Sequence, residues 1–599
     1  ATYRAVLDRY CVACHNRRTL AGSLALDDLD LEQVGPRAEV WEKVLEKLHT
    51  RAMPPPGRPR PEPAVYDAFG AWLERSLDQW AADHPNPGRP AIHRLNRLEY
   101  ANAERDLLHL DVDAQALLPA DDMAFGFDNN AAILTVAPGL FSRYMSAART
   151  VSRLAVGDSS IEADVVRYPV SPLLAQDGRM GEDLPFGSRG GAAVRHHFPR
   201  DGDYVLRIAL RQNGGRNEPQ EIDVRVDGER IALLRAGRWP DDAPPGSPGA
   251  RAADEGLAVR FPVRAGTRPV SVSFASRPMA PEGVAPARLP LWTFSTGRGY
   301  VEPMALDSFE IEGPYDGAET ARALATDTPS GRRIFVCEPA SAADEEACAA
   351  QIVGTLAWRA FHRPVTDEDL EDLLAFYREG RAEGGFRDGV RRALESILVD
   401  PEFLFRMERD PPGAAPATAY RLSDVELAAR ISFFLWASIP DDELLEAAEA
   451  GRLRDPDVLE AQVRRMLADE RAETLVTSFA AQWLHLRRMR TVSPDVNAFP
   501  AFDENLRDAL VRETELFVGS QLRDDRSVVE LLTADYTFVN ERLARHYGIP
   551  GVHGPRFRRV KWDDQRRRGL LGQGSILTLT SLATRTPPVA RGEGSTANA

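Results

Sequence analysis

Hydrophobic positions recur at two different spacings along this chain, and each change of spacing marks a region. In residues 1–84 the apolar positions lie three to four apart, in the segments 2–10, 38–49 and 63–80. This spacing predicts three amphipathic helices. In the last of them the apolar positions are Val65, Phe69, Trp72, Leu73, Leu77 and Trp80. This helix can close over the first one.

The rest of the chain changes period twice. After a Pro- and Gly-rich linker at 84–90, helical spacing continues through 91–165. From about 185 the spacing becomes two, and Asp227-Gly228 between two alternating runs predicts a hairpin. Short strands with turns between them predict an antiparallel β-sandwich over 175–315. Beyond 335 the spacing is helical again, with capping signals at Thr366/Asp369 and Ser423/Glu426.

The predicted fold class is therefore multidomain: an all-α N-terminal domain, a helical segment, a β-sandwich and then mainly α-helical domains. The expected domains are 1–84, 91–165, 175–315, 335–412, 418–548 and a partial C-terminal domain at 549–599. A chain of 599 residues is too long for one core, which agrees with this division.

Charge and composition exclude some classes of function. The formal net charge of -16 argues against a nucleic-acid-binding protein. We expect the basic cluster at 556–568 to be a solvated helix face. No run of 18 apolar residues occurs, so no transmembrane segment is expected. The first residues lack a basic, apolar leader, so an exported protein would be present here as the mature chain.

The motif CVACH at 11–15 carries the clearest chemistry in the sequence. Cys11 and Cys14 lie one helical turn apart and can bond the two vinyl groups of a haem, while His15 can bind the iron as the proximal ligand. A zinc site would need more ligands at finger spacing, and a redox dithiol would expect a βαβ context. The motif predicts one covalent haem c.

A sixth haem ligand is expected in the stretch LHTRAMPPPGRPRP at 48–61. Met53 precedes three prolines, and this stiff strap can hold its thioether over the open haem face. His49 is the rival ligand, and a surface role for it together with a packing role for Met53 is the alternative. Histidine–methionine ligation suits electron transfer.

Two further groups of residues could have a special role. Cys337 and Cys348 lie in a polar stretch that enters a helix, and we expect a disulfide there, with free buried thiols as the alternative. An acidic cluster could bind a cation such as calcium, although it lacks EF-hand spacing and caps or Asx turns are the simpler interpretation. Its members are Asp121, Asp122, Asp128, Asn129 and Asn130.

The helical regions contain no motif typical of catalysis: no phosphate loop, no G-x-S-x-G elbow and no H-E-x-x-H helix occurs. His485 is expected to be a core or surface histidine. The β-sandwich shows no spaced aromatic platform, so a structural or docking module is as good an interpretation as a carbohydrate binder.

The ordered set of local patterns resembles the planctomycete-type cytochrome c multidomain proteins, whose other domains were long catalogued as uncharacterised. The patterns include CVACH, AMPPPGRPRP, HRLNRLEYANAERDLL, LPADDMAFGFDNN, LAWRAFHRPVT, RLSDVELAARISFFLW and GLLGQGSILTLTSLATRTPPVARG. The resemblance covers about residues 5–592. It implies a class I-like cytochrome c domain, a jelly-roll-like sandwich similar to carbohydrate-binding modules, and helical domains after it.

Residue by residue, the resemblance assigns Cys11, Cys14 and His15 to haem attachment, Met53 to the family's Met-Pro-Pro position, and Cys337 with Cys348 to its cysteine pair. Members of this family typically continue into a second C-x-x-C-H, whereas residues after TPPVARG here read EGSTANA. Either this is a shortened form or the printed sequence is incomplete, so the resemblance does not establish electron transfer between two haems within the chain.

We expect an exported protein, in the periplasm or at the cell surface, that transfers electrons through one haem and docks a redox partner protein or a substrate. The alternatives are a haem-dependent oxidoreductase subunit of a larger complex, acting on a glycan or another substrate, and a binding or assembly protein with a structural haem. The acidic net charge could steer a basic partner such as a small cytochrome.

Overall fold

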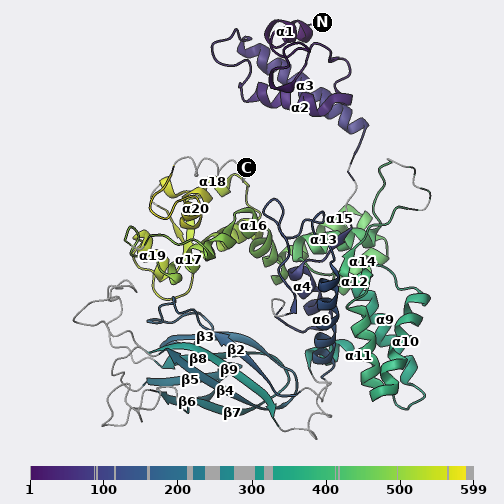
Figure 1. Ribbon diagram of the computed structural model, residues 1–599, viewed down its shortest axis with the longest axis vertical. Coiled ribbons are helices and arrows are strands. Elements are labelled where there is room, and N and C mark those ends of the chain that lie inside the picture. Colours follow the sequence, from purple (N-terminus) through teal and green to yellow (C-terminus); the bar gives the residue numbers. More distant parts are fainter. Residues whose placement is uncertain are drawn as a thin grey trace. The chain divides into compact units, whose positions relative to one another are not determined.

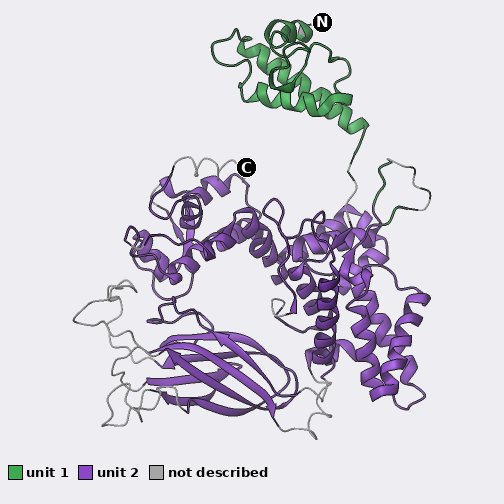
Figure 2. Cartoon of the chain, in the orientation of Figure 1, with its two compact units in different colours: residues 1–90, 409–421 green, residues 91–408, 422–599 purple. Residues whose placement is uncertain are grey.

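The protein is described here from a computed structural model. The described residues are 2–86, 88, 92–113, 117–157, 162–211, 220–236, 256–275, 304–315, 328–411, 413, 415, 418–495, 497–562 and 565–587. The chain forms two compact units (Figure 2), unit 1 with residues 1–90 and 409–421 and unit 2 with residues 91–408 and 422–599. Helices and antiparallel sheets both occur, so the mixed, multidomain architecture is confirmed.

Unit 1 contains the three predicted helices and two short 3-10 turns. They are α1 (Thr2–Tyr10), η1 (Ala21–Ser23), η2 (Gly35–Arg37), α2 (Ala38–His49) and α3 (Pro63–Asp83). Pro63 begins α3, where its missing N–H costs no hydrogen bond. Tyr3 of α1 stacks on Phe69 and Trp72 of α3, with ring centroids 5.2 and 5.0 Å apart. The first and last helices therefore close on each other as predicted.

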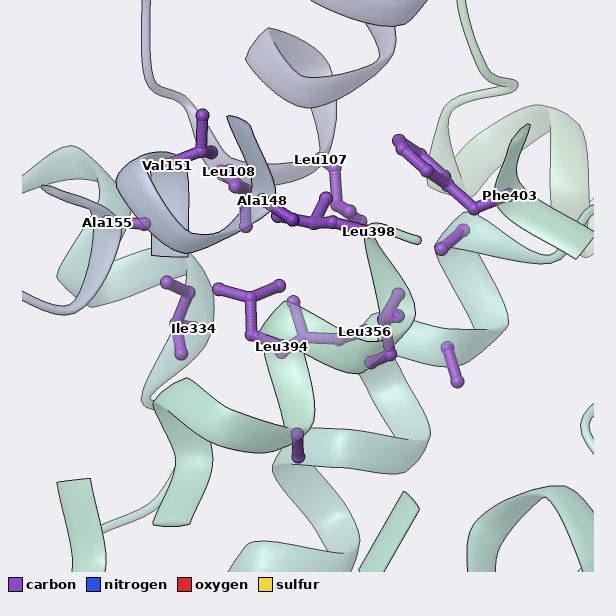
Figure 3. Packing of buried hydrophobic residues seen from close by; sticks show 14 of the residues in the cluster. Leu107, Leu108, Ala148, Val151, Ala155, Ile334, Leu356, Leu394, Leu398 and Phe403 are labelled. Atoms are coloured by element: carbon purple, nitrogen blue, oxygen red, sulfur yellow. The ribbon is translucent and has the colours of Figure 1, made fainter. Parts of the chain in front are cut away.

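The helical core of unit 2 combines segments from both sides of the sandwich in the sequence. Its elements are β1 (His93–Arg94), α4 (Arg97–Leu108), α6 (Pro138–Val156), α8 (Pro329–Ile334), α9 (Glu345–Ala360), α10 (Asp367–Gly384), α11 (Phe386–Ile397), α12 (Pro401–Leu404) and β10 (Phe405–Arg406). Leu107, Val151 and Leu394 meet in this core (Figure 3). β1 pairs antiparallel with β10, so His93 lies opposite Arg406.

The β-sandwich has two four-stranded antiparallel sheets, ordered β2-β9-β4-β7 and β3-β8-β5-β6 (Figure 1). The strands are β2 (Asp164–Pro169), β3 (Ser188–Phe198), β4 (Gly202–Arg211), β5 (Gln220–Val226), β6 (Glu229–Ala236), β7 (Ala258–Val263), β8 (Gly266–Ala275) and β9 (Ala305–Tyr315). The hairpin between β5 and β6 turns at Asp227-Gly228, as predicted.

The period-two pattern did not reveal the first two strands of the sandwich. β2 begins at Asp164, before the predicted start at 175, and its side chains are mostly exposed, which hides the alternation. β3 buries a histidine among its inward-facing side chains: His196 is 5% exposed and lies 2.8 Å from the Tyr168 hydroxyl through its Nδ1. A buried polar residue with a partner does not register as a hydrophobic position.

The C-terminal part of unit 2 is mainly helical. It contains α13 (Asp424–Trp436), α14 (Asp442–Glu449), η3 (Arg452–Arg454), α15 (Pro456–Ala468), η4 (Glu470–Ala472), the π-helix η5 (Leu475–Ala480), α16 (Ala481–Trp483), η6 (Leu486–Arg490), α17 (Glu504–Arg523), α18 (Glu530–Thr533), β11 (Tyr536–Val539), α19 (Glu541–Tyr547), β12 (Arg558–Lys561), η7 (Gln565–Arg567), η8 (Leu570–Gly572) and α20 (Gly574–Leu579). Capping boxes form at Thr366/Asp369 and Ser423/Glu426, as predicted.

The basic cluster at 556–568 is solvated but is not the predicted helix. Arg558–Lys561 forms the edge strand β12, which pairs antiparallel with β11 so that Arg559 lies opposite Phe538. Arg559 places its guanidinium 3.5 Å from the centre of the Tyr536 ring. This cross-strand pairing and the cation–π contact come from a distant segment, so the local charge pattern could not indicate them.

Two further predictions can be compared with the structure. Cys337 and Cys348 are joined in a disulfide, so that pairing is confirmed and the free-thiol alternative is wrong. Among the helices of the described residues, none is long and apolar enough to cross a membrane. Residues 588–599, where the sequence shows no second haem motif, lie outside the described part.

Candidate haem site

The motif CVACH forms an additional helical turn after α1. The amide of Cys11 donates to the carbonyl of Leu7 at 2.8 Å, which continues the helix past Tyr10. The amide of His15 then donates to the carbonyl of Cys11 at 2.9 Å. Cys11 and Cys14 are not bonded to each other. The structure therefore brings two free thiols and one imidazole together in a single turn, as the motif predicts.

The imidazole of His15 is held by its own loop. Nδ1 donates a hydrogen bond to the carbonyl of Ala21 at 2.8 Å, and the carbonyl of His15 accepts from the amide of Leu26 at 2.9 Å. An Nδ1–H donor fixes the tautomer in which Nε2 has a free lone pair, and such a hydrogen bond orients metal-binding histidines. His15 is thus prepared to bind a metal through Nε2.

The Asn16 side chain fixes the loop that follows the motif. Its amide donates to the carbonyl of Val12 at 2.7 Å, while its Oδ1 accepts from the amides of Arg18 and Thr19 at 3.0 and 2.9 Å. These bonds close the turn on both sides of His15. These hydrogen bonds explain why a short polar residue follows the histidine, which the motif alone did not reveal.

The environment of Cys11 argues against a redox dithiol. Burial, followed by the neighbouring Cys14, raises the pKa of the Cys11 thiol to about 11. Reactive dithiols need the opposite, a thiolate stabilised at neutral pH. A protonated, half-buried thiol beside an apolar core suits covalent attachment of an apolar group.

Met53 and His49 have different surroundings. The Tyr66 hydroxyl of α3 donates to the backbone carbonyl of Met53 at 3.0 Å and so fixes the strap, while the Met53 side chain is 39% exposed. His49 lies against the backbone of α3, where a Cβ added to Gly70 would be 3.3 Å from its Nε2. His49 is nevertheless exposed, and Met53 as the sixth ligand stays a prediction.

The core of unit 1 contains a polar atom that tests whether a haem fits. Trp41 is fully buried, and its Nε1–H has no hydrogen-bond acceptor in the described part of the chain. A buried donor without a partner is costly, and a haem propionate is an acceptor. Cys11 also packs at the margin of the apolar cluster formed by Leu7, Trp41, Phe69 and their neighbours. The residues present therefore fit a haem.

The acidic residues considered for calcium bind arginines and backbone amides. Asp121 accepts from Arg94 and from the amide of Arg97, each at 2.6 Å. Asp128 accepts from the Asn96 amide at 3.1 Å and pairs with Arg487. Within the described residues, no group of three or more His, Cys, Asp and Glu side chains is arranged to hold a metal ion. Calcium binding stays a prediction.

The remaining members of that cluster do not join a common site. Asn130 accepts the amide of Ala132 at 3.0 Å through its Oδ1, an Asx turn of the kind offered as the simpler interpretation. Asp122 and Asn129 are exposed. His485, for which no ligand role is predicted, packs its ring against Gly126 of the loop that carries the acidic cluster.

Among the buried carboxyl groups of unit 2, those of Glu104 and Glu513 are fully buried, and the sequence patterns did not reveal them. Burial raises the pKa of Glu104 to about 8, and the Tyr100 side chain opposes only part of this rise. The Tyr100 hydroxyl lies 3.5 Å from the Leu398 carbonyl. Burial also raises the pKa of Glu513 to about 7, although Thr537 and Tyr547 donate hydrogen bonds to it at 2.6 and 2.7 Å. The signal in the sequence for such burial is a glutamate at a position where the helical pattern expects a hydrophobic residue.

A cleft of about 1020 Å³ in unit 2 is lined mainly by charged residues. Its central carboxylates are paired: Asp442 accepts from Arg333 and Arg359, and Asp441 pairs with Arg465 and Arg471. Arg333 and Asp442 are 109 residues apart in the sequence, so no local motif indicates the cleft. Its ion pairs are sufficient to explain the residue types found there.

Three segments of the chain match family models. Residues 93–157 match PSD3, a protein of unknown function (DUF1587); residues 348–408 match PSD5, a protein of unknown function (DUF1595); and residues 422–549 match PSD4, a protein of unknown function (DUF1592). The chain therefore carries domains of the planctomycete cytochrome c type, as the resemblance implied. No curated protein and no solved structure matches the chain.

The matched segments coincide with the helical parts of unit 2. The first spans β1, α4 and α6, the second spans α9 to β10, and the antiparallel pair of β1 with β10 joins them. All three lie outside residues 1–84, so the assignment of the haem domain depends on the geometry of unit 1.

Proposed function

We propose that this protein is an exported c-type cytochrome that transfers single electrons through one covalent haem in unit 1. The other domains would dock a redox partner or a substrate. The observation that carries the proposal is the state of His15, which follows two free thiols within one helical turn. Its Nδ1 donates to the carbonyl of Ala21, and this leaves Nε2 free to bind a metal. The Trp41 indole, which has no hydrogen-bond acceptor among the described residues, and the three matched domains support it.

Each side chain of unit 1 would have a defined role toward the cofactor. Cys11 and Cys14 would bond the two vinyl groups, His15 would bind the iron through Nε2, and Met53 would supply a thioether from the strap. A bound haem supplies a one-electron couple between ferrous and ferric iron. A stiff, proline-rich strap keeps the ligand set unchanged between these states, which favours electron transfer over substrate chemistry.

The disulfide between Cys337 and Cys348 supports an exported location. Such bonds persist in oxidising compartments and are rare in the cytosol. Covalent haem attachment also implies export, so two independent features favour the periplasm or the cell surface.

The visible absorption spectrum of the purified protein tests the proposal. We expect haem bands that survive denaturation, because the cofactor is covalently attached, and a low-spin spectrum that carbon monoxide does not change. A protein without covalent haem would contradict the proposal. A high-spin spectrum that shifts with carbon monoxide would favour the oxidoreductase alternative, since it would show an open position on the iron.

Two single variants identify the sixth ligand. Met53→Ala should convert the spectrum to high spin and open the iron to carbon monoxide. His49→Ala serves as the matched control, because it removes the rival ligand at the end of α2, and it should leave the spectrum unchanged. The reverse result would exchange the two assignments.

A further inference from the structure

Exposed aliphatic side chains gather at one place in the C-terminal part of unit 2. Val528 and Val529 directly precede α18 and are 74% and 59% exposed, and Leu532 within α18 is 59% exposed. Leu571 of η8 is 51% exposed. We call these four residues the aliphatic patch. Exposed apolar patches mark surfaces that bind a partner or a membrane.

Backbone contacts hold α18 and η8 side by side. The amide of Gly569, the residue before η8, donates to the carbonyl of Ala534 at 3.0 Å. Gly569 also lies so close to the backbone of Leu531 and Leu532 that a side chain would not fit there. Leu571, two residues further on, therefore belongs to the same surface as α18.

The stability of the fold does not explain the aliphatic patch. Each of the two elements already places one leucine inside: Leu570 is 5% exposed, and Leu531 packs against the same apolar cluster. Leu532 and Leu571 are the next residues in the sequence, and they are exposed. A polar side chain at such a position would lose no buried area.

The basic cluster at 556–568 lies beside this patch. It contains seven basic and two acidic side chains. Arg559 and Lys561 of the edge strand β12 lie 4.0 and 3.2 Å from Asp524 and Asp535, which flank α18 in the sequence. Arg568 directly precedes the glycine that contacts α18. We call four exposed members of the cluster the basic strip: Arg558, Arg559, Lys561 and Arg568.

We propose that the aliphatic patch and the basic strip bind the surface of an anionic lipid bilayer. The aliphatic side chains enter the boundary between headgroups and acyl chains, and the cationic groups donate hydrogen bonds to lipid phosphates. Residues of unit 2 alone carry this inference. It goes beyond the proposed function and does not depend on a haem in unit 1.

Composition favours a lipid surface over a protein partner. The patch contains only Val and Leu, whereas the centres of protein interfaces are enriched in aromatic side chains and methionine. Aliphatic side chains beside arginines and lysines are the composition of segments that lie in a membrane interface.

Charge complementarity favours an anionic bilayer. Arg558 and Arg568 form no ion pair with the described residues, so their charge is available to a ligand. The whole chain has a net charge of -16, but at 0.1 M ionic strength the Debye length is about 10 Å. The basic strip, rather than distant acidic residues, therefore determines the field at the patch. An anionic surface is attracted to this face.

Flotation of the full chain with lipid vesicles tests the inference. Vesicles with about 30% phosphatidylglycerol should bind the protein about tenfold more tightly than vesicles of phosphatidylcholine alone, and added salt should weaken the binding. Equal binding to both kinds of vesicle, or binding to neither, would overturn the inference.

A pair of serine variants tests the aliphatic patch without changing the net charge. Val528→Ser/Leu532→Ser should weaken binding to the anionic vesicles about tenfold, because less apolar area enters the interface. The matched control is Val165→Ser/Leu173→Ser, a valine of β2 and a leucine after it that are 50% and 44% exposed. Equal losses in the two variants would contradict the proposed surface.

A pair of glutamine variants tests the basic strip. Arg558→Gln/Arg568→Gln should weaken binding to the anionic vesicles about tenfold and flatten its salt dependence. Arg264→Gln/Arg452→Gln is the control, because it removes two exposed arginines from other parts of unit 2 with the same change in net charge. If the control weakened binding as much, net charge rather than this surface would explain the attraction.

Hydrogen exchange locates the surface without any substitution. Anionic vesicles should slow amide exchange in residues 526–533 and 566–572 of the full chain, and slowing confined to other segments would overturn the inference. A dimer that Val528→Ser/Leu532→Ser dissociates in sedimentation velocity, without vesicle binding, would identify a second copy of the chain as the occupant instead. A protein that floats with anionic vesicles but lacks covalent haem would contradict only the proposed function.

Discussion

Unit 1 places its polar chemistry in loops next to the motif, whereas the helical part of unit 2 buries ionisable groups inside its cores. In unit 1 the imidazole of His15 is fixed by a carbonyl six residues away in the sequence. In unit 2, Glu104 and Glu513 are fully buried on α4 and α17, among segments far apart in the sequence. Local chemistry can be recognised in a sequence, and long-range burial cannot.

The two regions also differ in how their cores are completed. The apolar cluster of unit 1 includes Trp41, whose indole N–H lacks an acceptor in the described residues. The largest cluster of unit 2 is formed from α4, α6, α8, α9 and α11 together, as Figure 3 shows for Leu107, Val151 and Leu394. We therefore expect unit 1 to depend on a cofactor and unit 2 to be stable through packing alone.

The largest expected effect comes from removing the attachment thiols. The double variant Cys11→Ser/Cys14→Ser should retain no haem after denaturation and should lower the thermal stability of unit 1, because a bound cofactor stabilises the folded state. Haem staining of a denaturing gel and calorimetry measure the two results. Cys337→Ser/Cys348→Ser is the control, which should keep its haem and lose about 3 kcal/mol of stability in unit 2. Haem retained by the first variant would contradict the comparison.

Core truncation should affect each unit separately. Leu394 in unit 2 and Leu73 in unit 1 are fully buried, and replacing either by Ala should cost about 2–5 kcal/mol. Because the units are separate compact bodies, Leu394→Ala should lower the calorimetric transition of unit 2 and leave the haem spectrum intact. Leu73→Ala should change the haem spectrum and spare that transition. A single transition shifted by both variants would show that the units unfold together.

The buried carboxyl group of Glu104 should make unit 2 sensitive to pH. Its folded pKa, about 8, lies above the ordinary value of 4.5, so between these values the unfolded chain releases the proton and the folded chain keeps it. Raising the pH therefore favours unfolding, by at most about 1.4 kcal/mol per pH unit for this group. Urea unfolding at pH 5 to 8 measures the slope.

Glu104→Gln should flatten this slope, because the amide does not titrate. Glu513→Gln is the comparison variant: it should remove the smaller contribution of Glu513, whose pKa is raised to about 7, and leave that of Glu104. A slope that neither variant changes would assign the pH dependence to other groups.

The smallest expected effect concerns a strained turn of unit 2. Ala124 and Phe127 exchange two backbone hydrogen bonds of 3.0 Å, and the central residues Phe125 and Gly126 have φ of 53° and 86°. This is a two-residue hairpin turn in which Asn is preferred at the first position. Phe125, which is 92% exposed, loses no burial on replacement, so Phe125→Asn should stabilise the protein by about 1 kcal/mol. Met123→Asn, outside the left-handed positions, should give no such gain in urea unfolding.

The sequence by itself determined the elements whose signals are local. The helices α1, α2 and α3, the turn at Asp227-Gly228 and the capping boxes at Thr366 and Ser423 all depend on residues within a few positions of one another. The same holds for the turn with Cys11, Cys14 and His15, because covalent attachment itself requires that spacing. The disulfide was also predictable, since its cysteines stand close together in a sequence with four.

Only the tertiary structure decided features that depend on distant segments. The strand β12 in the basic cluster, the pairing of β1 with β10 and the burial of Trp41 and Glu104 all arise from contacts across the chain. Burial changes the free energy of a charge and of an unpaired donor far more than its neighbours in sequence do. A sequence pattern records spacing, and the surroundings of a side chain exist only after the chain has folded.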